Sequence, residues 1–487
     1  MEQRLRGLDL MFNPRSIAFV GATEQLGKWG FIIFNNLITG GFPGKIYPVN
    51  PGRAEVLGYR AYPTVREVPG ELDLVVIAAP AGGVLAAVED CAAKGVKAVV
   101  VISAGFKEMG GAAAELEAEM AAKARAAGMV LVGPNGQGVC CPKNRVYPWM
   151  PHFFYPPAGP VAVVSQSGNV QGLMMTELWK LGIGVSKGVS SGNEADLGAA
   201  DFLSYFGQDP DTKVILSYME GLTDGRRFLE IGRETAGQKP VVLLKGGLTE
   251  SGVSAAKSHT GALAVSDELF AAACRQAGLI RAKTIYEASV MAAAFVNRPL
   301  PRGRRVGIVT GGGGLGVIAA DLCAQAGLTV PELSKDTLAK IAAKMPDWWV
   351  PGNPVDLVAG LNFGVVPGIL ETIMMSNEID ALLLLFIGPQ SQDPDGFKPM
   401  NEQTVKMQKM WESMEAMYQA FPAMLGQMMD RTGVPIYVVS DFGKGTEAEK
   451  KVKTDPRYAV IFADLESACG ALAAMAGYQA FRSRQAE

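Results

Sequence analysis

Short apolar runs rich in β-branched residues alternate with alanine-rich stretches of helical periodicity almost from end to end of this sequence. Five strands are predicted before residue 142, from the runs SIAFVGA, KIYPVNP, LDLVVIAAP, AVVVISAG and MVLVGPN. Later strands are predicted from PVAVVSQ, VILSYMEG, PVVLLKGG, RRVGIVT, ALLLLFIG and PIYVVSD. Strands that are buried on both faces read as continuous apolar runs, and parallel strands need crossover helices between them. The pattern therefore predicts an α/β fold in which doubly wound parallel sheets are covered by helices.

The chain of 487 residues is long enough for about three domains of about 150 residues each. A stretch rich in proline and aromatic residues at 142–160 breaks the alternation, as a linker or docking loop would, and RPLPRGRR at 298–305 predicts a second linker. The two later regions each open with a strand, a loop and a helix, as variations on one fold. The expected domains are 1–142, 158–298 and 303–480.

The charge pattern argues against several classes of protein. With 45 basic and 48 acidic residues and no basic block, the chain lacks the charge distribution of a nucleic-acid-binding protein. The first residues contain no apolar signal segment, and apolar runs such as 381–387 are too short to span a bilayer, so we expect a cytoplasmic location. The six cysteines show no CxxC spacing, which favours reduced thiols over a disulfide framework or a zinc site.

A methionine-rich segment at 397–432 has its apolar residues at alternating three- and four-residue steps. This spacing predicts one apolar helical face that is bent or broken at Pro422. Packing on its own sheet, with methionine as a gap filler, is the favoured interpretation, and contact with a partner helix is the alternative. The residues of this face are Met407, Met410, Met414, Met417, Phe421, Met424 and Met428.

Two glycine loops follow predicted strands. The loop VGATEQLG at 20–27 would point backbone N–H groups and a helix N-terminus at an anion, which favours a phosphorylated ligand. A nicotinamide dinucleotide fits less well, because the three-glycine motif is incomplete and the second strand ends in Val49–Pro51 instead of an acidic residue. A full GxGxxG at 311–316 lacks that acidic residue too, and predicts a tight, closely packed strand-to-helix turn.

The second region begins with a polar strand-to-helix junction at 165–169, where hydroxyl and amide groups meet the positive end of a helix. A phosphate could be held there. Capping of the helix without any ligand is the alternative interpretation.

The chain contains two histidines, and His259 lies among small residues in the sequence KSHTGA. Imidazole chemistry at neutral pH would therefore depend on His259, although a single histidine can also be purely structural. Small neighbours leave the ring accessible to a phosphoryl donor. Glu220 ends a predicted strand, and its carboxylate could accept a hydrogen bond from one ring nitrogen and leave the other nucleophilic.

A set of ordered motifs resembles the NDP-forming acyl-CoA synthetase family, relatives of the succinyl-CoA synthetase α subunit. The motifs are VGAT, YPVNP, VISAGF, VGPNGQG, VSQSGN, SSGNEADLG, YMEGLTDGRRF, SHTGALAVSD and NPVDL. The resemblance covers residues from about 10 to 475. It implies a Rossmann-like CoA-binding domain, two flavodoxin-like domains, and a loop histidine that carries phosphate between the CoA site and a nucleotide site.

The resemblance assigns roles to residues of this sequence. It implies His259 as phosphate acceptor and Glu220 as its stabilising carboxylate. The implied phosphate cradle consists of Ser165, Gln166, Ser167, Gly168 and Asn169. The implied CoA contacts are Gly21, Thr23, Gln25, Asn50, Pro51, Arg53, Ile102, Ser103 and Ala104. No metal ligand is expected on this chain.

The resemblance implies the reaction acid + CoA + ATP ⇌ acyl-CoA + ADP + phosphate, through acyl phosphate and phosphohistidine. No ATP-grasp domain is found, so the nucleotide and Mg²⁺ are expected on an ATP-grasp β subunit in an α2β2 assembly. The sequence departs from the family at Gly136, where cysteine is usual, and in the longer segments 142–160 and 397–432. The alternative is a non-catalytic protein of the same fold that binds CoA or acyl-CoA, but such a protein would need neither the histidine motif nor Glu220.

Overall fold

The computed structural model of the chain describes residues 2–252, 267–358, 363–386, 401–440 and 461–486. The chain divides into two compact units, Met1–Trp179 with Ile183–Ala292, and Lys180–Gly182 with Ala293–Glu487. Within the described ranges, we find no helix with the length and apolar character needed to cross a membrane.

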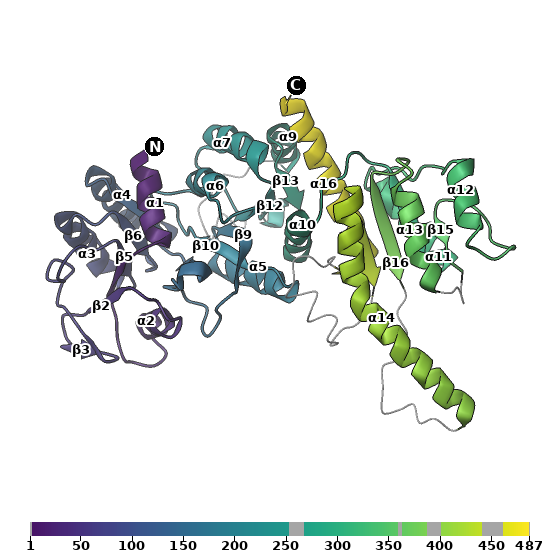
Figure 1. Ribbon diagram of the computed structural model, residues 1–487. Coiled ribbons are helices and arrows are strands. Elements are labelled where there is room, and N and C mark those ends of the chain that lie inside the picture. The colour runs from purple at the N-terminus through teal and green to yellow at the C-terminus, as the bar shows by residue number, and fades with distance from the viewer. Residues whose placement is uncertain (1, 253–266, 359–362, 387–400, 441–460, 487) are drawn as a thin grey trace. The chain divides into compact units, whose positions relative to one another are not determined.

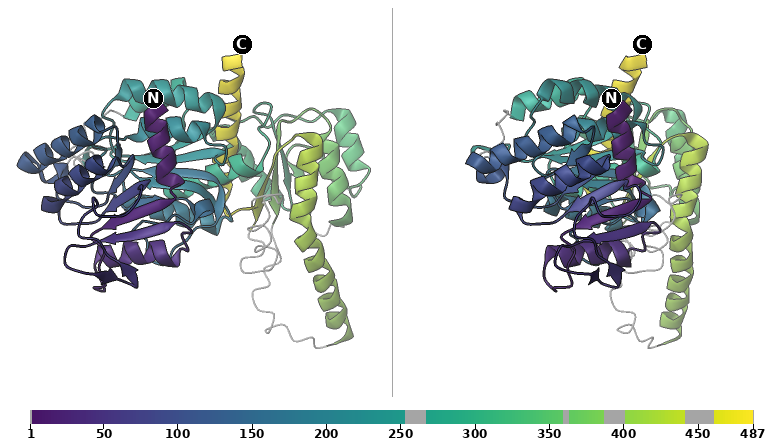
Figure 2. Two further views of the ribbon diagram at one scale, coloured as in Figure 1. Left: turned by 60° about the vertical axis from the view of Figure 1, so that its left-hand side comes forward. Right: turned by 90° about the vertical axis from the view of Figure 1, so that its left-hand side faces the viewer.

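The first sheet has five parallel strands in the order β2-β1-β5-β6-β7. Its strands are β1 (Ser16–Val20), β2 (Lys45–Val49), β5 (Leu74–Ile77), β6 (Ala98–Val101) and β7 (Val130–Val132), and a small hairpin joins β3 (Glu55–Val56) to β4 (Tyr59–Arg60). Its helices are α1 (Glu2–Phe12), α2 (Trp29–Thr39), α3 (Ala81–Lys94), the short η1 (Lys107–Met109) and α4 (Gly111–Ala126). Helices α3 and α4 pack together on one face, and α2 lies on the other (Figures 1 and 2). The five strands and the doubly wound arrangement predicted from sequence are confirmed.

The second sheet belongs to the same unit and has the order β13-β12-β11-β9-β10-β8. Its strands are β8 (Gly138–Cys140), β9 (Ala158–Ser165), β10 (Val185–Ser190), β11 (Val214–Met219), β12 (Val241–Lys245) and β13 (Ile280–Ala282). Its helices are η2 (Pro142–Asn144), α5 (Gly168–Lys180), α6 (Ala199–Gln208), α7 (Gly225–Gln238), α9 (Asp267–Ala277) and α10 (Ile285–Asn297), of which the last continues into the second unit. Strands β9, β11 and β12 were predicted from apolar runs, whereas β10 and β13 were missed.

The segment at 142–160 is packed, which agrees with a docking loop, the second of the two interpretations of this segment. Strand β8, just before it, pairs antiparallel with β10 and closes one edge of the second sheet. Trp149 is fully buried, and the Asn36 side chain donates hydrogen bonds to the backbone oxygens of Trp149 and Pro151, both at 2.9 Å. The segment thereby fastens the second sheet to helix α2.

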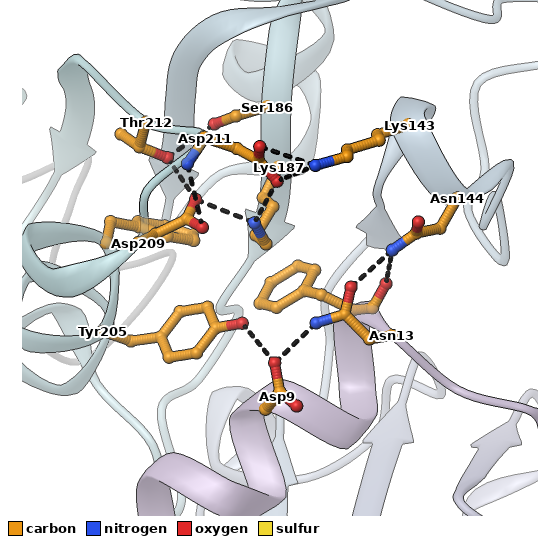
Figure 3. A network of polar contacts seen from close by, with 12 residues as sticks. Asp9, Asn13, Lys143, Asn144, Ser186, Lys187, Tyr205, Asp209, Asp211 and Thr212 are labelled. Carbon is orange, nitrogen blue, oxygen red and sulfur yellow. Dashed lines mark hydrogen bonds and ion pairs between the residues drawn. The ribbon is translucent and has the colours of Figure 1, made fainter.

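Strand β10 contains a buried charge. Lys187 is 3% exposed and its Nζ lies 2.8 Å from Asp209 Oδ2. Figure 3 shows the surrounding polar network, in which Lys143 pairs with Asp211 at 2.7 Å and Tyr205 bonds to Asp9 of α1 at 3.5 Å. Because a buried ammonium ion needs a charged partner, this pairing makes a lysine tolerable inside a central strand.

The second unit contains a five-stranded parallel sheet of order β15-β14-β16-β17-β18. Its strands are β14 (Val306–Thr310), β15 (Val355–Asp356), β16 (Ala381–Phe386), β17 (Ile436–Ser440) and β18 (Ile461–Phe462). Its helices are α11 (Gly313–Gln325), α12 (Lys335–Ala342), η3 (Phe363–Val365), α13 (Val366–Met374), α14 (Glu402–Thr432) and α16 (Leu465–Ala486). Helices α12, α13 and α14 share one core with the sheet, and α11 packs with α16.

Helix α14 runs through Pro422, so of the two predicted outcomes at this proline, a bend or a break, the break is wrong. Its C-terminal part contributes buried Leu425, Met428 and Met429 to the core of the sheet, and this packing compensates for the missing backbone N–H. Packing on its own sheet is therefore confirmed for this part of the helix. The side chains of Met407, Met410, Met414 and Met417 lie outside the described residues.

Candidate functional site

The predicted CoA residues lie at the carboxyl ends of β1, β2 and β6, on one edge of the first sheet. In the sheet, β2 lies on one side of β1 and β5 on the other, so the direction of the chain crossovers reverses at β1. The carboxyl end of β1 is therefore the topological switch point. Gly21 follows β1 with φ +91°, and a Cβ at this position would lie 2.3 Å from Ala78 O. Only glycine allows this close approach of the β1 and β5 ends.

Asn50 ties the first two strand ends together. Its Nδ2 donates to Ala22 O at 2.8 Å, and its Oδ1 accepts from Gly52 N at 2.8 Å. Thr23 Oγ1 accepts from Gln25 N at 3.2 Å in the turn after β1. These side chains therefore shape the two loops, while the neighbouring Pro51, Arg53 and Gln25 are exposed at the edge.

The end of β6 is fixed by the residues that follow it. The side chain of Ile102 is buried in the core, and Ser103 Oγ donates to Ala79 O at 2.6 Å. Ala104 is exposed. The structure thus brings all nine predicted CoA residues to one sheet edge, but it turns the Ile102 side chain away from solvent.

The β9–α5 turn lies at the carboxyl edge of the second sheet. Ser165 Oγ donates to Ser167 O at 2.5 Å, and Ser167 Oγ accepts from Val170 N at 3.5 Å, so Ser167 caps α5. Asn169 Oδ1 accepts from Gln137 Nε2 at 2.8 Å. This geometry agrees with both interpretations of the turn, helix capping and the binding of a phosphate.

Gln166 connects this turn to the end of the adjacent strand β11. Its Oε1 accepts from the backbone N–H groups of Glu220 at 2.6 Å and Gly221 at 3.1 Å. Its Nε2 donates to Gly221 O at 2.9 Å. The Gln166 side chain therefore fixes the backbone that carries the Glu220 carboxylate.

Glu220 follows β11 directly, as the sequence predicted. Its Oε1 accepts a hydrogen bond from Tyr218 Oη at 3.2 Å. Lys245 ends the next strand, β12, and its Nζ donates to Glu220 O at 2.7 Å. Burial lowers the pKa of the Lys245 ammonium, which Glu220 opposes. Lys245 was missed, although a charge that ends an apolar strand is the same signal that identified Glu220.

His259 lies outside the described residues, in the segment 253–266. In the chain this segment follows β12, whose neighbour in the sheet is β11. The predicted cradle at 165–169 and Glu220 lie at the ends of the adjacent strands β9 and β11.

Glu194 was also missed. Ser191 Oγ donates to Glu194 Oε1 at 2.8 Å, and Gln166 hydrogen-bonds to the same carboxylate. Burial raises the pKa of Glu194 to about 7, against these hydrogen bonds. Its φ of +56° places a residue other than glycine in the left-handed region. Ser191 is a local partner of Glu194, but Gln166 and the burial that raises this pKa come from other segments, so the sequence pattern alone did not single out Glu194.

The glycine loop of the second unit connects β14 to α11. A Cβ at Gly316 would lie 3.0 Å from Pro354 Cβ and 3.1 Å from Thr310 Cγ2, which agrees with the predicted close packing. By contrast, Gly311, Gly312 and Gly314 have no heavy atom within 4 Å of the position of a Cβ. Packing therefore accounts for Gly316 but not for these three glycines.

Three family models match the sequence. They are a CoA binding domain at residues 15–142, a succinyl-CoA ligase like flavodoxin domain at 158–295, and a ligase-CoA domain at 306–400.

Related proteins resemble most of the chain. The α subunit of ADP-forming acetate–CoA ligase I from Pyrococcus furiosus is 40% identical over 392 residues, which cover 80% of this chain and 84% of the relative. The α subunit of its ligase II is 39% identical over 386 residues, or 78% and 83% of the two chains.

A solved structure shows the same fold over almost the whole length. The acetyl-coenzyme A synthetase 1 of Candidatus Korarchaeum cryptofilum, in complex with phosphate and ADP, is 31% identical with a TM-score of 0.84 and covers 99% of each chain. With matches to a CoA binding domain and a succinyl-CoA ligase like flavodoxin domain in this order, and with these relatives, the chain belongs to the NDP-forming acyl-CoA synthetase family, as an α-subunit-type acid–CoA ligase.

Proposed function

We propose that this chain carries phosphate on His259 while it interconverts an acyl-CoA and a free acid, and that an ATP-grasp β subunit supplies the nucleotide site. The observation that carries this proposal is the convergence of Gln166 and Glu220 at the ends of adjacent strands. Gln166 fixes the Glu220 backbone through two N–H groups at 2.6 and 3.1 Å. A carboxylate fixed in this way can orient an imidazole and stabilise its charged, phosphorylated form.

The proposed reaction proceeds in three steps. Phosphate attacks the acyl carbon of acyl-CoA, the C–S bond breaks, and CoA leaves as a thiol while acyl phosphate forms. A ring nitrogen of His259 attacks the phosphorus of acyl phosphate and releases the free acid. ADP then takes the phosphoryl group from the histidine and becomes ATP. The reverse sequence activates an acid at the expense of ATP.

We assign CoA to the carboxyl edge of the first sheet. Open α/β sheets bind ligands outside the carboxyl ends of the strands at the switch point, where Gly21, Asn50 and Ser103 lie. We assign phosphate to the turn 165–169, because the N-terminus of α5 provides backbone donors and a positive dipole end.

Mg²⁺ and the nucleotide belong, in this proposal, to the β subunit of an α2β2 assembly. Among the residues that the structure describes, no group of three or more His, Cys, Asp or Glu side chains could hold a metal ion. The chain alone is expected to bind CoA but not to turn over ADP.

Phosphate labelling tests the proposal. The chain together with an ATP-grasp subunit is incubated with labelled ATP and Mg²⁺, or with acyl-CoA and labelled phosphate. We expect an acid-labile, base-stable label that maps to His259, since a phosphoramidate is lost once the ring nitrogen is protonated. ADP-dependent turnover by the chain without a partner, or a label on another residue, would contradict the assignment.

A further inference from the structure

Among the hydrogen bonds that hold the backbone of the loop 103–107 after β6, three are made by Glu108, Glu117 and Asn135. This loop carries Ser103 and Ala104, two of the residues assigned to CoA. The contacts are Glu108 Oε1 to Gly105 N at 2.6 Å, Glu117 Oε2 to Lys107 N at 3.0 Å, and Asn135 N to Ser103 O at 2.9 Å. The shape of the loop therefore depends on Glu108, Glu117 and Asn135.

All three of these residues meet at the side chain of Asn193. Its Nδ2 donates to Glu108 Oε2 at 2.6 Å and to Glu117 Oε2 at 2.8 Å. Its Oδ1 accepts from Asn135 Nδ2 at 3.3 Å. The amide thus uses both donors and its acceptor at once, which a carboxylate or a hydroxyl of similar size cannot do.

Asn193 keeps two carboxylates compatible with each other. Both oxygens lie within 2.8 Å of one nitrogen, and Glu117 is 4% exposed. Burial raises the pKa of Glu117 despite the hydrogen bond from Asn193. Burial also acts to raise the pKa of Glu108, but the hydrogen bonds from Asn193 and Gly105 outweigh it and lower this pKa. Without the amide, the two oxygens would face each other with no shared donor.

The segment that carries Asn193 comes from the second sheet, between β10 and α6, and lies along the edge strand β7 of the first. Three backbone bonds hold it there: Asn193 N to Pro134 O at 2.9 Å, Ala195 N to Gly133 O at 3.1 Å, and Leu197 N to Leu131 O at 3.2 Å. Two residues before Asn193, Ser191 N donates to Ser165 O of the β9–α5 turn at 2.9 Å. One short segment therefore contacts both the loop assigned to CoA and the turn assigned to phosphate.

We propose that Asn193 is a positioning residue that holds the loop 103–107 in the shape required for CoA and fixes it relative to the β9–α5 turn. The inference rests on the proposed assignment of CoA to the first sheet. In this proposal Asn193 acts through its hydrogen bonds to Glu108, Glu117 and Asn135.

Calorimetry with the full chain tests this role, with CoA as the probe. For N193A we expect the Kd of CoA to rise about tenfold, as loss of a charge-assisted hydrogen bond would produce. In the complex with the β subunit, the KM for CoA should rise similarly while kcat changes by less than about threefold. Two controls should bind CoA as the wild type does. E115Q makes an amide substitution at an exposed position of the same helix, and N144A removes an interface amide that donates to Phe12 O at 3.1 Å.

Variants that exchange the hydrogen-bond donor and acceptor at Asn193 distinguish a positioning role of this residue from a general loss of local stability. N193D adds a third carboxylate beside Glu108 and Glu117, so CoA binding should weaken more than in N193A. In the double variant N193D/E108Q, Nε2 of the new amide can donate to the new carboxylate while its Oε1 still accepts from Gly105 N, because separate oxygens of Glu108 make these two contacts. We expect this variant to bind CoA about tenfold more tightly than N193D, because one of the two carboxylate contacts of the new aspartate is replaced by a hydrogen bond.

Amide hydrogen exchange tests whether Asn193 holds the loop 103–107, whether or not CoA binds there. The amides of Gly105 and Lys107 should exchange faster in N193A than in wild type, and the Gly105 amide should exchange more slowly in N193D/E108Q than in N193D. If wild type fails to bind CoA but these amides behave as expected, the CoA assignment is wrong and the loop-holding role stands. Unchanged CoA affinity and unchanged exchange in N193A, or an equal loss in N144A, would overturn the inference.

Discussion

The β9–α5 turn and the β14–α11 turn share one plan but are stabilised differently. In each turn, the hydroxyl of the last strand residue donates to the carbonyl two residues later. The distances are 2.5 Å from Ser165 Oγ to Ser167 O and 2.9 Å from Thr310 Oγ1 to Gly312 O. The first turn contains the amide side chains of Gln166 and Asn169, whereas the second turn is a run of four glycines, 311–314.

This difference determines what each turn can position. Through Gln166, the first turn fixes the backbone of Glu220 on the neighbouring strand. The second turn has no side chain with which to do this, and the space beside Gly311, Gly312 and Gly314 is open. A side-chain-anchored turn can therefore place a chemical group, while a glycine turn leaves room for something to approach its backbone.

Substitution of His259 should have the largest effect and should show that covalent chemistry belongs to the first unit. His259→Asn keeps a polar side chain but removes the nucleophilic nitrogen, so turnover with the β subunit should fall by several orders of magnitude. CoA binding should survive. The control is His152→Asn, which changes the other, exposed histidine. Near-normal turnover of His259→Asn would disprove a phosphohistidine mechanism for this protein.

Glu220 and Gln166 should rank next, in that order. Glu220→Gln weakens the stabilisation of a phosphorylated imidazole by about 1.5 to 3 kcal/mol, which corresponds to about one to two decades in rate. Gln166→Ala keeps the carboxylate but leaves two backbone N–H groups without their acceptor, so we expect a loss of about tenfold. Single-turnover dephosphorylation of the labelled chain measures both effects.

A double variant shows whether Gln166 acts through Glu220. If it does, Gln166→Ala should cost less in the Glu220→Gln background than in the wild type, because the two changes affect one interaction. Fully additive losses would mean that Gln166 contributes separately, for example by contacting phosphate itself.

Alanine substitutions at two glycines of the second turn should differ in their effect on the free energy of unfolding. Gly316→Ala must push its Cβ against Pro354 and Thr310, and after the gain in helix propensity we expect a net loss of about 1 kcal/mol. Gly311→Ala places its Cβ in open space and should change the stability of the unit by less than about 0.5 kcal/mol. Denaturant unfolding of the two variants measures this difference. A large loss for Gly311→Ala would show that the turn is under a constraint that its packing does not reveal.

The sequence predicted the parts of this structure that depend on local pattern. The apolar runs of β1, β5 and β9 were found, and so was Glu220, since a charge that ends an apolar strand is a local feature. Strand β10 was missed because Lys187 interrupts its apolar pattern, and the compensating Asp209 lies in another segment. Asn193 could not be found in the same way, since its role consists of contacts with three distant side chains.

At the amino ends of the strands, the first and third sheets are alike, which allows a matched and smaller prediction. Arg15, before β1, donates its backbone N–H to Asp73 at 2.7 Å and two guanidinium hydrogen bonds at 2.9 Å. Arg305, before β14, does the same to Asp380 at 2.9, 3.1 and 2.9 Å. Each aspartate precedes the strand that pairs with the strand of its arginine, so each ion pair clamps two adjacent strands.

Asp73→Asn and Asp380→Asn should therefore each lower the thermal midpoint of their own unit by a similar, modest amount of about 2 to 4 °C. The Arg15 side chain lowers the pKa of Asp73. For Asp380, burial acts to raise the pKa, but hydrogen bonds from Arg305 outweigh it and lower the pKa. Because a lowered folded-state pKa gives stability above the ordinary aspartate value near 4, this stability is lost as the pH falls through the folded-state value. Melting curves at pH 7 and pH 3 should thus show variant and wild type converging in acid, for both units alike. If the variant still melts below the wild type at pH 3, the asparagine disturbs packing. If the two variants lower the midpoints of their units by clearly different amounts, the two ion pairs do not stabilise their units equally despite their similar geometry.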